Sequence, residues 1–286
     1  AYDVVGFHTP RDLKAFRTCL EEPIVDATFI DDTHVRVGDG ELIADVFPIG
    51  IDVDEIQKLS SDSQSMKTVQ RMVSSLDGRQ LLIGVDRLDY SKGLKLRLRS
   101  YERLLERYPN AQRNVTFIQI APPTRTGVRA YDEIRSELEQ TSGHINGRFA
   151  ESDWVPIRYL NKGVDRKPLM GFFRNADVGL VTPVRDGMNL VAKEYVAAQD
   201  PKNPGMLVLS SLTGAACELT DAIIVNPYDR DDVADGIANA LSMSLDERKE
   251  RTASMIEVLR KNDITAWRTR FVDALMRKRV GPRLDA

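Results

Sequence analysis

The stretch that decides the fold is DVGLVTPVRDGMNLVAKEYVAAQ, residues 177–199. Its first part, DVGLVTP, reads as a buried strand, and its last part, LVAKEYVAAQ, reads as a helix. The loop between them carries an acid, a glycine and an asparagine. Open α/β sheets usually bind their ligands at such a strand-to-helix junction. The stretch therefore predicts both a strand–helix unit and a candidate site.

The same alternation extends in both directions along the chain. Continuous Val/Ile/Leu runs are separated by amphipathic segments, which is typical of a parallel sheet covered on both faces. The predicted strands are 80–85, 115–121, 155–160, 177–183, 206–211 and 222–227, and the predicted helices are 94–109, 128–140, 165–175, 190–199 and 229–243. The sequence thus predicts a doubly wound α/β domain over residues 78–245.

The two ends of the chain have different patterns. Residues 2–7 predict a strand, residues 10–22 a helix, and the segment around Gly38-Asp39-Gly40 a hairpin, which together do not complete a second domain. Residues 245–262 and 263–279 predict two helices. We therefore expect an incomplete segment over 1–50, a main domain over 51–262, and a terminal helical segment over 263–286.

Composition narrows the class of protein. Lys+Arg number 40 and Asp+Glu 43 among 286 residues, which gives no basic excess and argues against a nucleic-acid partner. No apolar run approaches the roughly 18 residues of a membrane span. Cys19 and Cys217 have no metal-ligand spacing and suggest no disulfide framework, which favours a reducing cytoplasm. Because the chain begins at Ala1 without Met or a signal peptide, we expect a piece of something longer.

Two cations follow the first strand of the main domain. Arg87 and Lys92 lie around a turn that ends at Gly93, and cations at this edge of a sheet suit a diphosphate. The alternative is that both form surface ion pairs with Asp86 and Asp89.

Two further loops supply weaker candidates. Arg125, beyond the second strand, could bind a phosphate or carboxylate, or be a solvated loop residue. Gly163 precedes a helix, and a flat base could lie there with its edge bonded to the main chain of Val164. A glycine before a helix is also ordinary turn chemistry.

The loop RDGMNLVAKE, residues 185–194, is the most informative motif. From Gly187 onward it can present backbone N–H groups at a helix start, where the positive dipole end favours a diphosphate. Asp186 and Asn189 can bond sugar hydroxyls, and Glu194 can accept from a ribose. The alternative makes Asp186 an N-cap, with Lys193 and Glu194 as exposed helix residues.

No metal site is expected. The Asp229-Arg230-Asp231 segment resembles a metal-binding Asp pair, but it opens a helix, where capping acids are common. His8, His34 and His144 are scattered along the chain and form no ligand pattern.

Several motifs carry a family resemblance when they are taken in order. They are RLDYSKG, IAPPTR, INGRF, YLNKGVDRK, FFRNADVGLVTPVRDGMNLVAKEYVAAQ and IIVNPYD. Across nearly the whole chain, the sequence resembles the trehalose-6-phosphate synthases, which are retaining glycosyltransferases that transfer glucose from UDP-glucose to glucose 6-phosphate. The resemblance implies a GT-B architecture of two Rossmann-like domains. The chain would be the carboxyl-terminal donor-binding domain with the tail of the amino-terminal acceptor domain, to which the terminal helix with Trp267 would cross back.

The resemblance also implies roles for individual residues. Arg87 and Lys92 would bind the diphosphate as catalytic residues, and Arg125 would bind the acceptor phosphate. The other donor contacts it implies are Ile120, Val164, Asp186, Gly187, Met188, Asn189, Leu190, Val191, Ala192, Lys193 and Glu194.

The resemblance leaves several matters open. No cofactor or metal is implied, and a homo-oligomer is compatible with it. Because most of the acceptor site belongs to the missing half, we expect the isolated chain to be inactive. A sister glucosyltransferase with another acceptor, a pseudo-glycosyltransferase and a non-catalytic nucleotide-sugar binding module remain alternatives.

Overall fold

A computed structural model describes residues 2–124 and 129–280 of the chain, and the side chains of the described residues up to 277. The chain divides into two compact units, each described by itself below. The smaller unit consists of Ala1–Asp52 and Arg260–Ala286, and the larger unit of Val53–Leu259. Arg125 lies outside the described residues.

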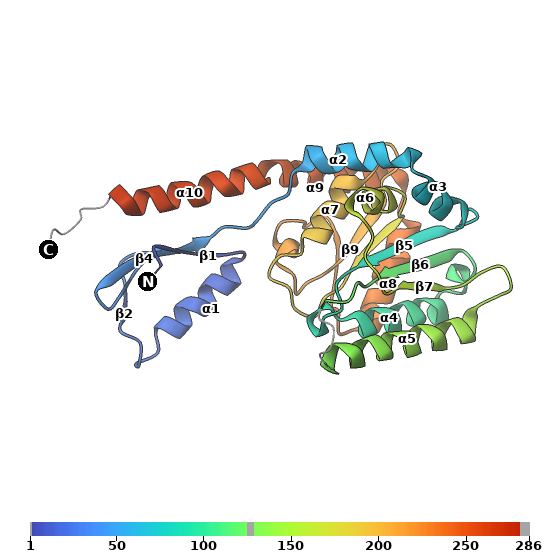
Figure 1. The fold of residues 1–286 in the computed structure, drawn as a ribbon, viewed down its shortest axis with the longest axis horizontal. Helices are drawn as coiled ribbons and strands as arrows, with labels where there is room; N and C mark the ends of the chain where they lie inside the picture. The colour runs from blue at the N-terminus through green and yellow to red at the C-terminus, as the bar shows by residue number, and fades with distance from the viewer. Residues whose placement is uncertain (1, 125–128, 281–286) are drawn as a thin grey trace. The chain divides into compact units, whose positions relative to one another are not determined.

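The larger unit is built on one six-stranded sheet (Figure 1). Its strands are β5 (Gln80–Val85), β6 (Val115–Ile120), β7 (Ile157–Leu160), β8 (Val178–Val181), β9 (Met206–Ser210) and β10 (Ile223–Val225). They lie in the order β10-β9-β8-β5-β6-β7, and every neighbouring pair is parallel. The predicted doubly wound parallel sheet is confirmed. The strand order reverses between β5 and β8, which is the topological switch point where such sheets bind ligands.

Helices cover both faces of this sheet. They are α2 (Val53–Asp62), α3 (Lys67–Ser74), α4 (Leu94–Arg107), α5 (Arg129–Phe149), α6 (Arg166–Arg174), α7 (Leu190–Ala198), α8 (Arg230–Ser242) and α9 (Leu245–Lys261). Helix α4 packs against α5 and α8, and α2 packs against α6 and α7. Figure 1 shows these two groups on opposite faces of the sheet.

Two helical segments differ from the sequence-based expectation. Helix α5 continues to Phe149 instead of ending at residue 140, because Leu138, Thr141 and Ile145 keep one face buried at helical spacing. Helices α2 and α3 fill residues 53–74, where no element was predicted.

Close packing fixes where α7 begins. Tyr195 of α7 is 1% exposed, and its hydroxyl donates to the Ala176 carbonyl at 3.0 Å. A Cβ at Gly179 of β8 would lie 2.6 Å from the Tyr195 ring, so glycine lets the helix approach the strand. Helix α7 is thereby seated against β8, with its N-terminus following the loop at the carboxyl end of that strand.

The smaller unit contains a four-stranded sheet in the order β1-β4-β3-β2. Its elements are β1 (Val4–Phe7), α1 (Pro10–Leu20), β2 (Ala27–Phe29), β3 (His34–Val37), β4 (Gly40–Val46) and α10 (Ile264–Val280). The predicted hairpin is confirmed, since Val37 of β3 pairs with Gly40 of β4. Helix α10 packs on this sheet, where the Trp267 indole donates to the Phe47 carbonyl at 3.2 Å.

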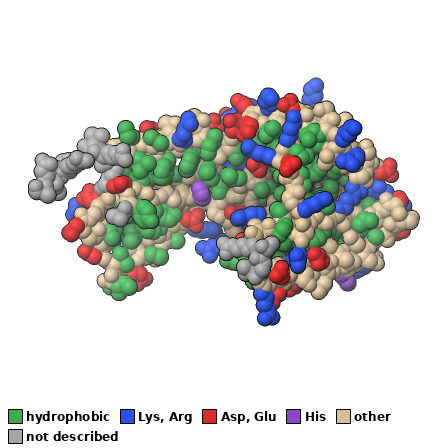
Figure 2. Space-filling view, in the orientation of Figure 1, with side chains coloured by type: hydrophobic (Ala, Val, Ile, Leu, Met, Phe, Trp, Pro, Cys, Tyr) green, Lys and Arg blue, Asp and Glu red, His purple; other side chains and the backbone are tan. Residues whose placement is uncertain are grey.

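The visible surface carries charge of both signs. In Figure 2, Lys and Arg side chains are interspersed with Asp and Glu side chains over the larger unit. Within residues 2–124 and 129–280, no helix combines the length and the apolar character that crossing a lipid bilayer requires.

Candidate functional site

Two turns interlock at the switch point. The 3₁₀ turn η2 (Tyr90–Lys92) follows β5, and the Ser91 carbonyl accepts hydrogen bonds from the main chain of Val184 at 2.9 Å and Arg185 at 3.2 Å. Gly93 has φ 62°, and a Cβ there would lie 2.9 Å from the Thr182 carbonyl. The close approach of the turns after β5 and β8 therefore requires glycine at this position.

Lys92 and Asp186 meet where these turns touch. The Lys92 ammonium lies 2.5 Å from Asp186 Oδ2, and the two side chains are 15% and 16% exposed. Asn189 Nδ2 donates to the same carboxylate oxygen at 2.9 Å. The structure thus brings together three residues that the sequence analysis selected from two separate loops.

The alternative pairing of the two cations with Asp86 and Asp89 is wrong for Lys92. Asp86 pairs with Arg97 at 2.7 Å, and Asp89 caps η2 by accepting from the Ser91 main chain at 2.8 Å. Burial raises the pKa of Asp89, but the Ser91 hydrogen bonds, aided by Lys92 and Arg87, outweigh burial and leave the pKa below its usual range.

Arg87 is exposed on the loop between β5 and η2. It lies two residues before Asp89, and its positive charge is the smallest of the contributions that lower the pKa of that carboxyl.

Asn189 begins helix α7 in an unusual conformation. It has φ 79° and ψ 90°, and its side-chain Oδ1 accepts from the Ala192 main chain at 3.0 Å. The alternative that Asp186 is the N-cap is therefore wrong. Helix geometry leaves the N–H groups of Leu190 and Val191 without an intrahelical acceptor. These two amides, at the positive end of the helix dipole, are suited to an anion.

The loop after β9 supports the Asp186 turn from behind. The Asp186 main chain donates to Leu212 at 3.2 Å and accepts from Gly214 at 3.1 Å. The Met188 carbonyl accepts from Ala215 at 2.7 Å, and the Met188 side chain is 4% exposed. Gly187, between them, is exposed. The turn is thereby held on both sides while Gly187 remains open.

Lys193 differs from the alternative that makes it an exposed helix residue. It is fully buried, and its ammonium lies 2.5 Å from Glu218 Oε2. It is therefore not an exposed helix residue, and any contact it makes with a ligand would come from its main chain. Ala192, which precedes it, is also fully buried.

Glu194 is partly buried on α7. Burial raises the pKa of its carboxyl above the usual range, and Glu55 adds to the rise while Arg166 opposes it. Arg166 begins α6, two residues after Val164, and binds Glu55 at 3.1 Å.

Val164 is half-buried in the loop between β7 and α6. Ile120 is 1% exposed at the carboxyl end of β6, and its carbonyl accepts from Asp86 at 3.1 Å.

The sequence analysis missed one buried polar cluster beneath these turns. Arg97 is 1% exposed, and its guanidinium contacts Asp86, Gln119 and Thr182. A signal was present, because Arg97 lies on the same helical face as the apolar Leu94 and Tyr101.

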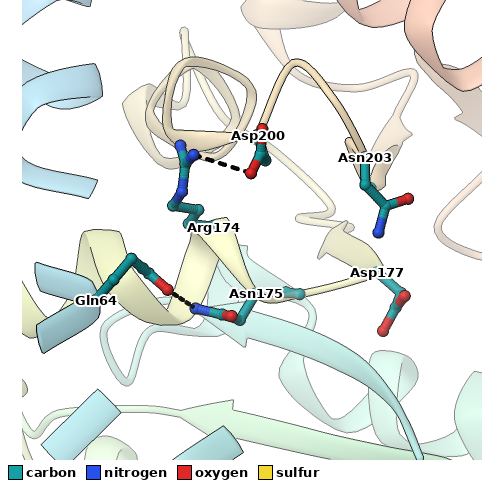
Figure 3. Close-up of a pocket in the computed structure, with 8 residues that line it drawn as sticks. Gln64, Arg174, Asn175, Asp177, Asp200 and Asn203 are labelled. Atoms are coloured by element: carbon teal, nitrogen blue, oxygen red, sulfur yellow. Dashed lines mark hydrogen bonds and ion pairs between the residues drawn. The ribbon is translucent and has the colours of Figure 1, made fainter. Parts of the chain in front are cut away.

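A pocket lies at the edge of the sheet opposite to the candidate site. It has a volume of about 200 Å³ and surrounds the segments that enter β8 and β9 (Figure 3). Its polar groups largely satisfy one another: Arg174 binds Asp200 at 3.0 Å, and Asn175 donates to Gln64 at 2.9 Å. These pairs account for the pocket as part of the scaffold.

The acidic segment before α8 is a helix cap, as predicted. Asp229 accepts from the main chain of Asp231 and Asp232 at 2.9 and 3.2 Å. Across the described part of the chain, no group of three or more His, Cys, Asp or Glu side chains could hold a metal ion.

The fold and the site together define a Rossmann-like α/β domain, with a lysine, a strained turn and two helix-terminal amides at its switch point. The chain belongs to glycosyltransferase family 20, which it matches over residues 1–277. It is 49% identical to trehalose-6-phosphate synthases of Cronobacter sakazakii and Escherichia coli over 282 residues. That match covers 99% of this chain and 59% of those relatives, so the chain spans about three-fifths of their length.

Solved structures give the same assignment. A UDP-forming alpha,alpha-trehalose-phosphate synthase from Burkholderia xenovorans, in complex with glucose-6-phosphate, is 48% identical with a TM-score of 0.93. The match covers 96% of this chain and 60% of that one. An Escherichia coli relative bound with UDP-2-fluoro glucose is 47% identical with a TM-score of 0.93, over 99% of this chain and 62% of its own.

Proposed function

We propose that this chain is the donor-binding part of a retaining glucosyltransferase that transfers glucose from UDP-glucose to glucose 6-phosphate, giving trehalose 6-phosphate and UDP. The observation that carries the proposal is the meeting of Lys92 with the Asp186 turn at the switch point of the sheet, 2.5 Å apart. Relatives of this family that are similar over nearly the whole chain include structures with a UDP-glucose analogue and with glucose-6-phosphate.

The donor diphosphate would lie between the cations and the helix terminus. Lys92 and Arg87 would neutralise it from one side, and the amides of Leu190 and Val191 from the other. Lys92 would exchange part of its contact with Asp186 for the phosphate oxygens, which leaves Asp186 free to accept from a hydroxyl of the glucose. Gly187, Met188 and Asn189 would complete the glucose contacts, partly through main-chain N–H groups.

The nucleoside would extend along the carboxyl edge toward α6. Glu194 would take the ribose hydroxyls, and its raised pKa is compatible with a carboxylate kept in a partly buried place to bond them. Val164 would bond the uracil edge through its main chain, with Ile120 as an apolar neighbour. Ala192 and Lys193 would line this part of the site through their main chain.

The remaining parts of the enzyme would complete the acceptor site. Residues 1–50 would be the tail of the acceptor domain, residues 51–262 the donor domain, and residues 263–286 the segment that returns to the acceptor domain. Arg125 would bind the phosphate of glucose 6-phosphate. We expect a cytoplasmic enzyme that needs no metal or cofactor and forms no complex with nucleic acid.

In the reaction, the acceptor hydroxyl would attack the glucose ring on the same face from which the diphosphate departs. The bond from the glucose anomeric carbon to the diphosphate oxygen breaks, the bond to the acceptor hydroxyl forms, and the acceptor proton passes to the departing phosphate oxygen. Arg87, Lys92 and the α7 amides would act mainly by stabilising the charge that grows on the leaving diphosphate.

A single substitution tests this role. Replacing Arg87 with alanine in an enzyme that contains the complete acceptor domain should lower the transfer rate by about a hundredfold or more. Arg71→Ala is the matched control, because Arg71 is an exposed arginine on α3 whose guanidinium donates to the Lys67 carbonyl of the same helix at 3.4 Å. Near-normal transfer by the Arg87→Ala enzyme would rule the role out.

Nucleotide binding separates this proposal from its rivals. Isothermal titration of the chain with UDP, ADP and GDP, and with their glucose conjugates, should show a preference for the uridine compounds. A sister enzyme with another acceptor would share that donor preference and would differ only when acceptors are compared in the complete enzyme. Binding of the uridine compounds without transfer by the complete enzyme would favour a non-catalytic module.

A further inference from the structure

Arg97 occupies a position where a charge is costly. It lies on the face of α4 that packs on the sheet, and its side chain is 0% exposed. Burying a guanidinium is unfavourable unless every donor finds a partner, and an apolar side chain of similar size is often as stable. The contacts of this arginine therefore need a structural reason.

The partners of Arg97 come from the ends of three adjacent strands. Its Nη1 lies 2.7 Å from Asp86, which follows β5, and 3.2 Å from Gln119 of β6, and its Nε donates to Thr182, which follows β8, at 3.0 Å. These strands are neighbours in the order β8-β5-β6. One side chain thus connects both sides of the switch point.

The cluster has little freedom to rearrange. Gln119 Nε2 donates to the carbonyls of Gly84 and Ile120, each at 3.1 Å, which turns its oxygen toward Arg97. A Cβ at Gly84 would lie 2.7 Å from that oxygen and 3.0 Å from Arg97 Nη1. The missing side chain of Gly84 therefore leaves the room that the cluster occupies.

The same guanidinium reaches the turn that carries Lys92. Arg97 Nη2 donates to the Lys92 carbonyl at 3.4 Å, while Thr182, on its other side, precedes the loop that leads to Asp186. Arg97 is thus bonded to both turns whose side chains form the Lys92–Asp186 pair. A site that stabilises charge depends on fixed positions of its donors, because a donor displaced by about 1 Å stabilises the charge of the ligand much less.

We propose that Arg97 is a positioning residue for the donor diphosphate: bonded to Thr182 and to the Lys92 carbonyl, it sets the spacing between the Lys92 turn and the Asp186 turn. It does not touch the substrate but acts through Lys92. This inference rests on the proposed function, because it assumes that the diphosphate binds between these turns.

The mildest perturbation is Thr182→Val, which removes the hydroxyl that Arg97 bonds and keeps the size of a residue that is 2% exposed. Arg97→Met is the stronger variant, although it leaves Asp86 buried without its cation. The matched control is Arg79→Met. Arg79 also donates to two main-chain carbonyls, those of Arg113 and Leu76, and to the carboxylate of Asp153. Because it precedes β5, it lies at the opposite edge of the sheet.

Two readouts separate positioning from general destabilisation. UDP and UMP affinities are measured by isothermal titration, and hydrogen exchange is measured at the amides of Val184 and Arg185, which donate to Ser91 across the two turns. Thr182→Val should weaken UDP about tenfold and UMP much less, and should speed exchange at both amides about tenfold. Arg79→Met should change neither UDP affinity nor these exchange rates.

A second comparison tests whether Arg97 acts through Lys92. In a Lys92→Ala background, Thr182→Val should weaken UDP by less than about twofold, because the group being positioned is already gone. An equal loss in both backgrounds, or unchanged UDP affinity in Thr182→Val, would overturn the proposal. If the wild-type chain does not bind UDP, the proposed function fails. The exchange rates then still decide whether Arg97 sets the two turns: faster exchange supports it, and unchanged exchange overturns it.

Discussion

Asn189 provides a sharp test of how the site is built. It combines φ 79°, which L-residues other than asparagine and aspartate rarely adopt, with a helix cap on Ala192 and a hydrogen bond to Asp186. Glycine and alanine at this position remove the same side-chain contacts. They differ because glycine adopts positive φ without steric cost and is itself an acceptable N-cap.

The expected free energies follow from these contacts. Asn189→Ala loses a cap worth about 1 kcal/mol and a hydrogen bond to a charged group worth about 1.5 kcal/mol. It also keeps an alanine in a conformation that costs about 1 kcal/mol more. We therefore expect Asn189→Ala to destabilise the larger unit by roughly 3.5 kcal/mol and Asn189→Gly by roughly 2 kcal/mol.

Urea unfolding followed by far-UV circular dichroism measures both variants. Asp229 is the matched control, because it caps α8 through two main-chain amides from an ordinary φ of −97°. Since no positive φ is relieved there, the gap between Asp229→Gly and Asp229→Ala should be smaller by about 1 kcal/mol. If Asn189→Gly is no more stable than Asn189→Ala, or if the two gaps are equal, the strained turn does not exist as described.

Three further predictions concern other groups near the site. The pKa of Glu194 is higher in the folded chain than in the unfolded chain. At pH values between these two pKa values, the folded chain binds more protons than the unfolded chain, so the stability of the fold falls as the pH rises through this range. Glu194→Gln should therefore gain stability relative to wild type as the pH rises above the usual glutamate pKa of about 4, and it should weaken UDP binding. Urea unfolding and isothermal titration at each pH measure these two effects. Lys193→Met should cost about 3–5 kcal/mol by leaving Glu218 without its cation, whereas Lys193→Met/Glu218→Leu should recover most of the loss. Gly93→Ala should destabilise by about 1–2 kcal/mol, whereas Gly143→Ala, in α5 with open space around it, should stabilise by about 0.5–1 kcal/mol. Urea midpoints are compared within each pair of variants. Equal midpoints for Lys193→Met and Lys193→Met/Glu218→Leu would contradict the Lys193–Glu218 ion pair. Equal midpoints for Gly93→Ala and Gly143→Ala would contradict the requirement for glycine at position 93.

Most of the larger unit could be predicted from periodicity. The strands from 80–85 to 222–227 read as continuous apolar runs because both faces of a parallel sheet are buried. Helices α2 and α3 were not predicted, because few of their residues are apolar and serine and charged residues separate the buried ones, among them Val53, Ile56 and Val69. The three-residue strand β2 is too short to give a periodic signal.

The site was predictable where it depends on the carboxyl edge of the sheet. Lys92 and Asp186 are 94 residues apart, and they meet because parallel strands end at the same edge. The burial of Lys193 was not predictable, because a charged residue is expected to be exposed unless its partner is known. The place of Arg97 on the apolar face of α4 signalled its burial but not its partners. Their partners, Glu218 and Asp86, are set by tertiary packing and leave no local pattern.

The most direct measurement compares UDP with UMP on the wild-type chain and on Lys92→Ala. If two cations and the α7 amides converge on a diphosphate, UDP should bind the wild-type chain more tightly than UMP, and Lys92→Ala should reduce this difference by about tenfold while UMP affinity changes little. Equal affinity of the wild-type chain for UDP and UMP would contradict the account, as would an unchanged difference in Lys92→Ala.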